Sequence, residues 1–143
     1  MTEREAVVRI FEGMRADIAS YRTLRELLAA QFNAAVQHRA GVMQEIAERL
    51  TQIATELEAR RRERVELASR LCKDRPSIRA VAARLQGSSR EAFEACWKAL
   101  EALVEECREL NQRNWHVVVT QHEIMQRVLH GETHTYEAVH AAR

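Results

Sequence analysis

The sequence has few residues that interrupt helices, with one proline and four glycines in 143 residues. Proline and glycine are the strongest helix breakers, so their scarcity favours long helices over many short strands and turns. Cysteine is also rare, and Cys72, Cys96 and Cys107 show no CxxC spacing. We expect these cysteines to be small apolar residues in a reducing compartment, and the protein to be cytoplasmic.

Several function classes lack their usual sequence signals. No apolar run approaches the ~20 residues needed to cross a membrane, and the charged N-terminus does not resemble a signal peptide. The net charge is +1, from 22 basic and 21 acidic residues, which argues against nucleic-acid binding. There is no glycine-rich phosphate loop and no nucleophile beside a base, so we expect neither an enzyme nor a cofactor.

Two sequence patterns could suggest a metal site or an anion-binding site, but neither is sufficient to predict one. His130 and His134 have a spacing that could chelate a metal on a helix, but Gly131 lies between them and no cysteine has a metal-site spacing beside them. Glu137 and His140 form one Glu-x-x-His pair without the second that a metal bundle needs, so no metal is expected. The segment "EARRRER" at 58–64 is flanked by acidic residues and is interpreted as a solvated face rather than a site for phosphate or lipid.

Apolar periodicity at steps of three and four residues predicts three long helices. We place them at about 3–37, 42–71 and 89–130, with a short helix at 77–86. Thr2 with Glu5 and Ser88 with Glu91 have the spacing of capping boxes at helix starts. The segment ending at Gly41 is the best place for the first reversal, and Pro76 marks the second. Gly131 is expected to end the last helix and to leave a mobile tail over 131–143.

The predicted fold is all-α, a single domain over 1–143 built as an antiparallel three-helix bundle with coiled-coil character. The last helix carries a heptad seam for about five heptads, through the residues Phe93, Cys96, Leu100, Leu103, Cys107, Leu110, Asn114, Val117, Gln121, Ile124 and Val128. It is longer than its two partners. We therefore expect its C-terminal part to overhang the bundle with an apolar face that the other two helices do not cover.

Two amides occupy this seam, Asn114 and Gln121. A buried amide costs stability unless it is hydrogen-bonded, and its best-known use in a coiled coil is to fix register. A register device inside the bundle and a polar contact for a partner are both compatible with the pattern.

A second stripe runs beside the seam and widens the apolar surface between 115 and 129. It comprises Trp97, Val104, Asn111, Trp115, Val118, Met125 and Leu129, and three consecutive valines at 117–119 extend the arc further. Such a surface is buried by its own fold, by a second copy of the chain, or by a partner protein. The pattern leaves these three alternatives open.

The segment "CRELNQRNWHVVVTQHEIMQRVLHGETHTYEA", from Cys107 to Ala138, resembles the FlgN family of flagellar export chaperones. Leu110, Asn111 and Asn114 match a family L-N-x-x-N core, and Thr135 with Tyr136 matches the start of a family tail. Trp115 and Glu137 stand where the family often has glycine.

The resemblance implies a chaperone that binds the C-terminal assembly helices of hook-associated proteins of the FlgK and FlgL type and delivers them to the export gate. It implies a docking role at the gate for Tyr136. The expected partner-binding residues are Asn111, Asn114, Trp115, Val118, Val119, His122, Met125 and Leu129. The alternative function is a self-assembling coiled-coil or adaptor protein, in which the same face forms a homodimer.

Overall fold

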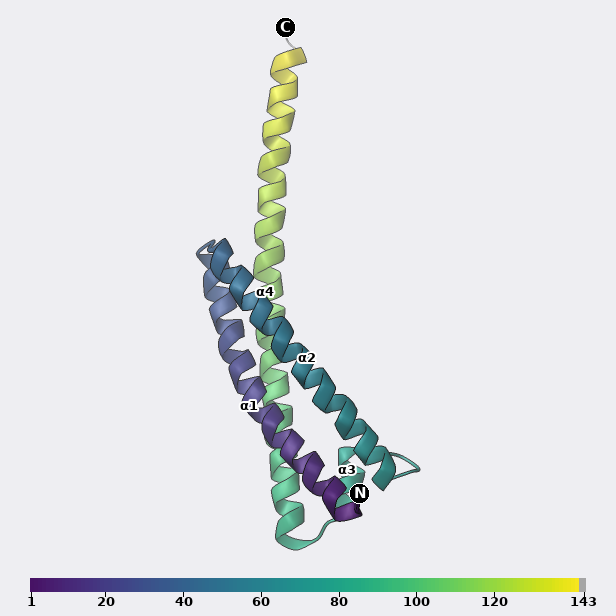
Figure 1. The fold of residues 1–143 in the computed structure, drawn as a ribbon. Helices are drawn as coiled ribbons and strands as arrows, with labels where there is room; N and C mark the ends of the chain where they lie inside the picture. The colour runs from purple at the N-terminus through teal and green to yellow at the C-terminus, as the bar shows by residue number, and fades with distance from the viewer. Residues whose placement is uncertain (142–143) are drawn as a thin grey trace.

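The computed structural model describes the backbone of residues 1–141 and the side chains of residues 1–131. Its elements are α1 (Glu3–Val36), α2 (Ala40–Leu71), α3 (Ile78–Ala83) and α4 (Gly87–Ala141). All regular structure within the described residues is helical, which confirms the predicted all-α class. Figure 1 shows α1 and α2 as an antiparallel hairpin, with α4 running beside α1 and far beyond the end of the hairpin.

Helix α1 begins at the predicted capping box. The Thr2 hydroxyl accepts a hydrogen bond from the Glu5 amide at 3.1 Å, and the Glu5 carboxylate accepts one from the Thr2 amide at 3.1 Å. The reversal after α1 lies at residues 37–39, within the predicted segment "VQHRAG" that ends at Gly41. His38 adopts the left-handed conformation with φ 56°, so Gly41 is not needed for the turn and lies in the first turn of α2.

The short helix and the start of α4 differ by a few residues from the prediction. Ser77 caps α3 by accepting from the Ala80 amide at 3.0 Å, but α3 ends at Ala83 rather than near residue 86. Helix α4 begins at Gly87, whose φ of 60° turns the chain from α3 into the new direction. Ser88 therefore lies within the first turn of α4 and not at its N-cap.

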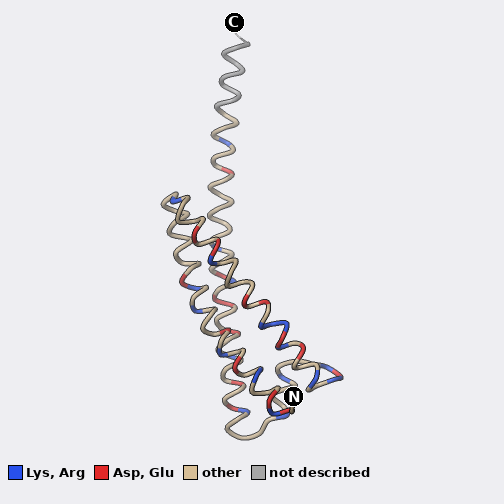
Figure 2. The backbone as a smooth tube through the Cα atoms, in the orientation of Figure 1, with Lys and Arg blue, Asp and Glu red and all other residues tan. Residues whose placement is uncertain are grey.

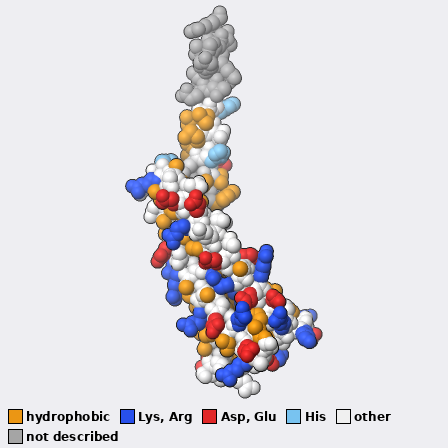
Figure 3. Space-filling model, viewed as in Figure 1, with side chains coloured by type: hydrophobic (Ala, Val, Ile, Leu, Met, Phe, Trp, Pro, Cys, Tyr) orange, Lys and Arg blue, Asp and Glu red, His pale blue; other side chains and the backbone are white. Residues whose placement is uncertain are grey.

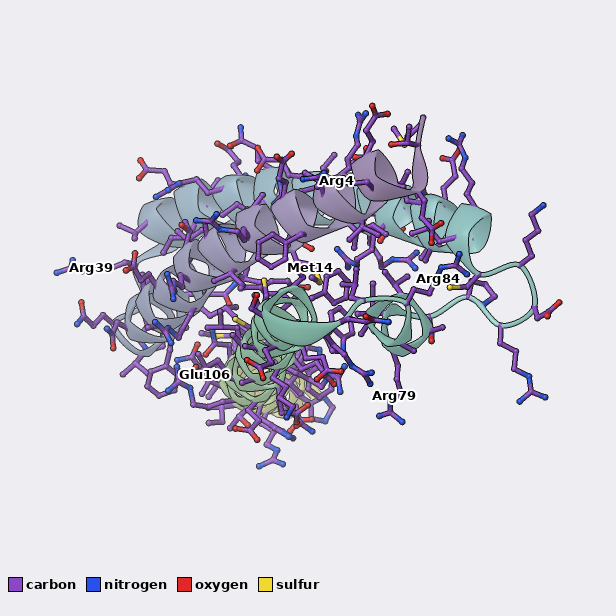
Figure 4. The ribbon with its side chains drawn as sticks, turned by 90° about the horizontal axis from the view of Figure 1, so that it is seen from below. Arg4, Met14, Arg39, Arg79, Arg84 and Glu106 are labelled. Atoms are coloured by element: carbon purple, nitrogen blue, oxygen red, sulfur yellow. The ribbon has the colours of Figure 1, made fainter. Side chains whose placement is uncertain are left out.

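Helix α1 is the central element of the bundle, since it makes the main contacts with both α2 and α4. Helices α2 and α4 scarcely touch, and α3 contacts both of them near the lower end of the bundle. The larger core cluster joins all four helices and includes Ile10, Met14, Leu67, Val81 and Phe93. Met14 is fully buried between α1 and the other helices (Figure 4). A smaller cluster of Leu27, Ala34 and Ile46 closes the upper part of the hairpin.

The prediction that α4 ends at Gly131 is wrong, because the helix continues to Ala141. Glycine inside a helix costs only about 1 kcal/mol relative to alanine and does not force termination, and no proline follows it. The predicted mobility of 131–143 stays a prediction, and the side chains after Gly131 lie outside the described residues. Within the described part of the chain, no helix is long and apolar enough to cross a membrane.

Candidate partner-binding site

The C-terminal part of α4 passes the α1–α2 hairpin and carries an exposed apolar surface. Helix α1 ends at Val36, and the Gln121 side-chain amide donates to the Ala35 carbonyl oxygen at 2.8 Å. The backbone of α4 then continues for 20 residues, from 122 to 141, which corresponds to about 30 Å at ~1.5 Å per residue. We refer to residues 115–141 of α4, which comprise the last turns beside α1 and the part beyond its end, as the overhang.

The apolar side chains of the overhang are among the most exposed large hydrophobic residues of the described chain. Between 40% and 62% of their surface is accessible, in contrast to the buried seam lower on the same helix. The residues are Trp115, Val118, Ile124, Met125, Val128 and Leu129. Figure 3 shows hydrophobic side chains gathered on α4 above the end of the hairpin. The predicted exposed face therefore exists on the single chain.

Charged residues avoid this face. Between Asn114 and Gly131 the only Asp, Glu, Lys or Arg residues are Glu123 and Arg127, whereas charges of both signs follow α1, α2 and the lower part of α4 (Figure 2). At about 100° per residue, both lie on the side of the helix opposite Met125. The exposed surface is thus mainly apolar, with His122 beside Trp115 and Leu129, and it carries no Asp, Glu, Lys or Arg.

Asn114 lies inside the bundle, not on the exposed face. It is 3% exposed, and its side-chain amide donates to the Leu28 carbonyl oxygen at 2.7 Å and to Gln31 Oε1 at 2.9 Å. Its own oxygen accepts from the Arg113 guanidinium at 3.3 Å, and that guanidinium lies 3.9 Å from the centre of the Phe32 ring. The structure therefore assigns Asn114 to the α1–α4 interface, in agreement with a register device.

The bond from Asn114 belongs to a regular series along the interface. The Cys107 thiol contacts the Tyr21 carbonyl oxygen at 3.5 Å, Asn114 bonds to Leu28, and Gln121 bonds to Ala35. Each pair is separated by 86 residues, and successive pairs are one heptad apart. Helices α1 and α4 thus run parallel in constant register until α1 ends. The next seam residue of the same series, Val128, lies beyond the end of α1.

The remaining predicted site residues fall into three groups. Asn111, Trp115, Val118, His122, Met125 and Leu129 are exposed on α4, whereas Val119 is half-buried. Tyr136, the residue implied for the export gate, has its side chain outside the described residues. The exposed group includes Trp115 and Met125, whose residue types are enriched at protein interfaces.

Sequence reasoning missed a polar cluster in the bundle. Asp17 is 1% exposed on α1 and accepts from Arg60 Nε at 2.5 Å and from Arg64 Nη1 at 2.7 Å, both on α2. Two arginines of the "EARRRER" segment therefore point into the bundle, which corrects the interpretation of that segment as a solvated face. The available signal was an acid between Met14 and Ile18 on the apolar stripe of α1.

The Asp17 cluster influences the pKa of Tyr21 and contacts Trp97 through Arg64, but it is separate from the overhang. Burial, together with the Asp17 carboxylate, raises the pKa of Tyr21 above its ordinary value. The Arg64 guanidinium also lies 5.9 Å from the centre of the Trp97 ring, which links α2 to α4 across the groove between them.

A comparison with protein families finds that the model described as FlgN protein matches residues 1–131. No curated protein and no solved structure matches the chain. The family match covers the whole helical bundle and the first part of the overhang. FlgN proteins are chaperones and are not known as enzymes. The chain belongs to the FlgN family, whose role is that of flagellar export chaperones that bind hook-associated proteins.

Proposed function

We propose that this chain acts in the cytoplasm on hook-associated proteins of the FlgK and FlgL type. It binds their C-terminal assembly helices on the overhang, prevents their premature assembly, and delivers them to the export gate. The exposed apolar face from Trp115 to Leu129 is the observation that supports this function most directly. Contiguous apolar surface of this kind marks protein interaction sites in soluble proteins.

Helix α1 provides a template for how a client helix binds. Below the end of the hairpin, α1 covers the heptad seam of α4 through residues such as Leu28 and Ala35. Above it, the same seam continues through Ile124 and Val128 without α1. A client helix with an apolar heptad pattern can take the equivalent position, as in helix-on-helix recognition.

The proposed mechanism requires only binding and release. Full burial of one Val, Leu, Ile or Met side chain contributes about 1.5–3 kcal/mol, and several together can offset the cost of immobilising a partner. A client helix held on the overhang has its own apolar face occupied, so it cannot pack into a growing assembly. Release exchanges this contact for one with other client subunits.

A pair of substitutions tests the binding face. Met125→Lys places a charge on the apolar face, and Glu123→Lys places the same residue on the opposite face, two positions away. We expect Met125→Lys to weaken binding to a purified hook-associated protein at least about tenfold, and Glu123→Lys to change it less than about twofold. Equal effects of the two substitutions would argue that the client binds elsewhere.

Hydrogen exchange tests the extent of the contact. Addition of the same client is expected to slow exchange of backbone amides over 115–136, while exchange in α1 and α2 stays unchanged. No change over 115–136 would count against the proposed site.

Delivery to the gate is assigned to Tyr136 by the family resemblance. Tyr136→Ala is expected to leave client affinity unchanged and to reduce client export in cells. A loss of client affinity would show that Tyr136 belongs to the client site instead.

The alternative function, a self-assembling coiled coil, uses the same apolar face to join two copies. Light scattering over a concentration series distinguishes the two functions, since the chaperone should remain able to bind client as a monomer. A tight dimer that survives the double substitution of Val118→Asp and Met125→Asp would exclude dimerisation through this face.

A further inference from the structure

The apolar arc of the overhang is wider than one packed helix covers. Trp115 and Ile124 are nine residues apart, about two and a half turns, so they lie on nearly opposite sides of the helix. Val118, Met125 and Val128 fill the arc between them, and all five are at least 40% exposed. A helix that packs on one neighbour typically uses a stripe about 100° wide. The overhang therefore offers nearly twice that width.

The lower part of α4 shows what such an arc requires. There the seam positions contact α1, through Cys107 and Asn114. The neighbouring flank is covered from another direction, because Arg64 of α2 lies over Trp97 and the core cluster brings α3 against α4. In its lower part, α4 is therefore covered by α1 on one side and by α2 and α3 on another, although its apolar arc is narrower there than in the overhang.

In heptad terms the overhang adds one position to this pattern. The covered part of α4 uses positions a, d and e, as in Phe93, Leu103 and Trp97. The overhang keeps all three and adds the adjacent b position, which is occupied by Trp115 and Leu129. A single helix that continued the line of α1 along α4 would leave Trp115 and Leu129 exposed.

We propose that the client covers the overhang with two of its helices packed side by side. One lies on the seam, in line with α1 and beyond its end, over Ile124 and Val128. The other lies on the flank, over Trp115 and Met125, in the direction from which α2 and α3 cover the lower part of α4. This inference rests on the proposed function and adds to it the number of helices that the client supplies.

A second copy of the chain is a less suitable source of the second helix. Two overhangs paired through one stripe would each still expose the rest of the same wide arc, so self-association does not close the surface. The absence of Asp, Glu, Lys and Arg from this face, with Glu123 and Arg127 on the far side, also fits a client surface that is mainly apolar on both helices.

Three substitutions to the same residue test the inference. Val128→Lys alters the seam, Trp115→Lys alters the flank, and Glu123→Lys alters the opposite side of α4. Affinity for a purified full-length hook-associated protein is measured by calorimetry, and circular dichroism checks that each variant is folded. We expect Val128→Lys and Trp115→Lys each to weaken binding at least about tenfold, Glu123→Lys to change it less than about twofold, and light scattering to give a one-to-one complex.

The outcomes separate this inference from the proposed function. If Trp115→Lys changes affinity less than about twofold while Val128→Lys weakens it strongly, or the reverse, the client uses one helix and the inference is overturned. A complex with two chaperones and one client also overturns it, because the second helix then comes from the chaperone. If the unmodified chain binds no hook-associated protein, the proposed function itself fails.

Discussion

The Asn114 side-chain amide donates to the carbonyl oxygen of Leu28 at 2.7 Å, from a seam position of α4 to the backbone of α1. A helical carbonyl retains a second lone pair after its own helix bond, so α1 accepts this contact without losing a backbone hydrogen bond. The bond fixes the axial position of α4 against α1. It therefore also fixes where α1 ends along α4, and so how much of the apolar seam is left uncovered.

Replacement of Asn114 by aspartate should destabilise the bundle strongly. A carboxylate cannot donate to the Leu28 carbonyl and would be buried beside it, at a cost of about 3 kcal/mol. Asn111→Asp, three residues earlier at an exposed position, should change stability by less than about 0.5 kcal/mol. Urea denaturation followed by circular dichroism measures both. Similar losses for the two variants would contradict the assigned role of Asn114.

The overhang could be predicted from sequence because it depends on helix lengths. Apolar spacing and Pro76 predict the approximate ends of α1 and α2 and the start of α4. Because the predicted last helix is longer than the first two, an overhang is expected. The end of α4 is predicted wrongly because a single glycine, Gly131, is not by itself a stop signal. Glycine ends a helix when it adopts the left-handed conformation or when a proline follows soon after, whereas Gly131 lies within α4 and no proline follows it.

The role of each polar seam residue could not be predicted, because it depends on the register between helices distant in sequence. Asn114 and Gln121 each meet an α1 carbonyl that lies 86 residues earlier, and nothing local in the sequence specifies that offset. Similarly, Asp17 finds its arginines 43 and 47 residues later on α2. Sequence periodicity locates such residues on a face but does not identify their partners.

The ion pairs of Asp17 should matter far more to stability than those on the surface. Asp17→Asn leaves Arg60 and Arg64 partly buried without their carboxylate, and removal of one partner of a buried pair typically costs about 3–5 kcal/mol. Glu66→Gln removes an exposed pair with Arg70 and should cost less than about 0.5 kcal/mol. Thermal or urea unfolding measures the difference. An Asp17→Asn variant as stable as Glu66→Gln would show that this cluster contributes little to the bundle.

Trp115 should report directly on client binding. It is 62% exposed, whereas Trp97 is half-buried in the core, so the Trp97→Phe variant leaves a single tryptophan on the overhang. Its fluorescence emission in the free protein should be that of a solvated indole and should shift to shorter wavelength when a hook-associated protein binds. The Trp115→Phe variant is the control, since its remaining tryptophan should not respond. An unchanged spectrum of the Trp97→Phe variant on saturation would place the client away from Trp115.

The reactivity of Cys107 tests whether α1 and α4 stay packed against each other when the overhang binds a client. Cys107 is 3% exposed, and burial raises its pKa, so little of the reactive thiolate forms near neutral pH. In a Cys72→Ser, Cys96→Ser variant, Cys107 should react with a thiol reagent far more slowly than in urea, and client binding should not accelerate the reaction. Burial likewise raises the pKa of Cys96, but this thiol is less buried than that of Cys107. In the matched variant that keeps only Cys96, the thiol should therefore react faster, because the reagent reaches it more easily. Rapid modification of Cys107 in the presence of client would instead mean that the client separates α4 from α1 rather than binding beyond it.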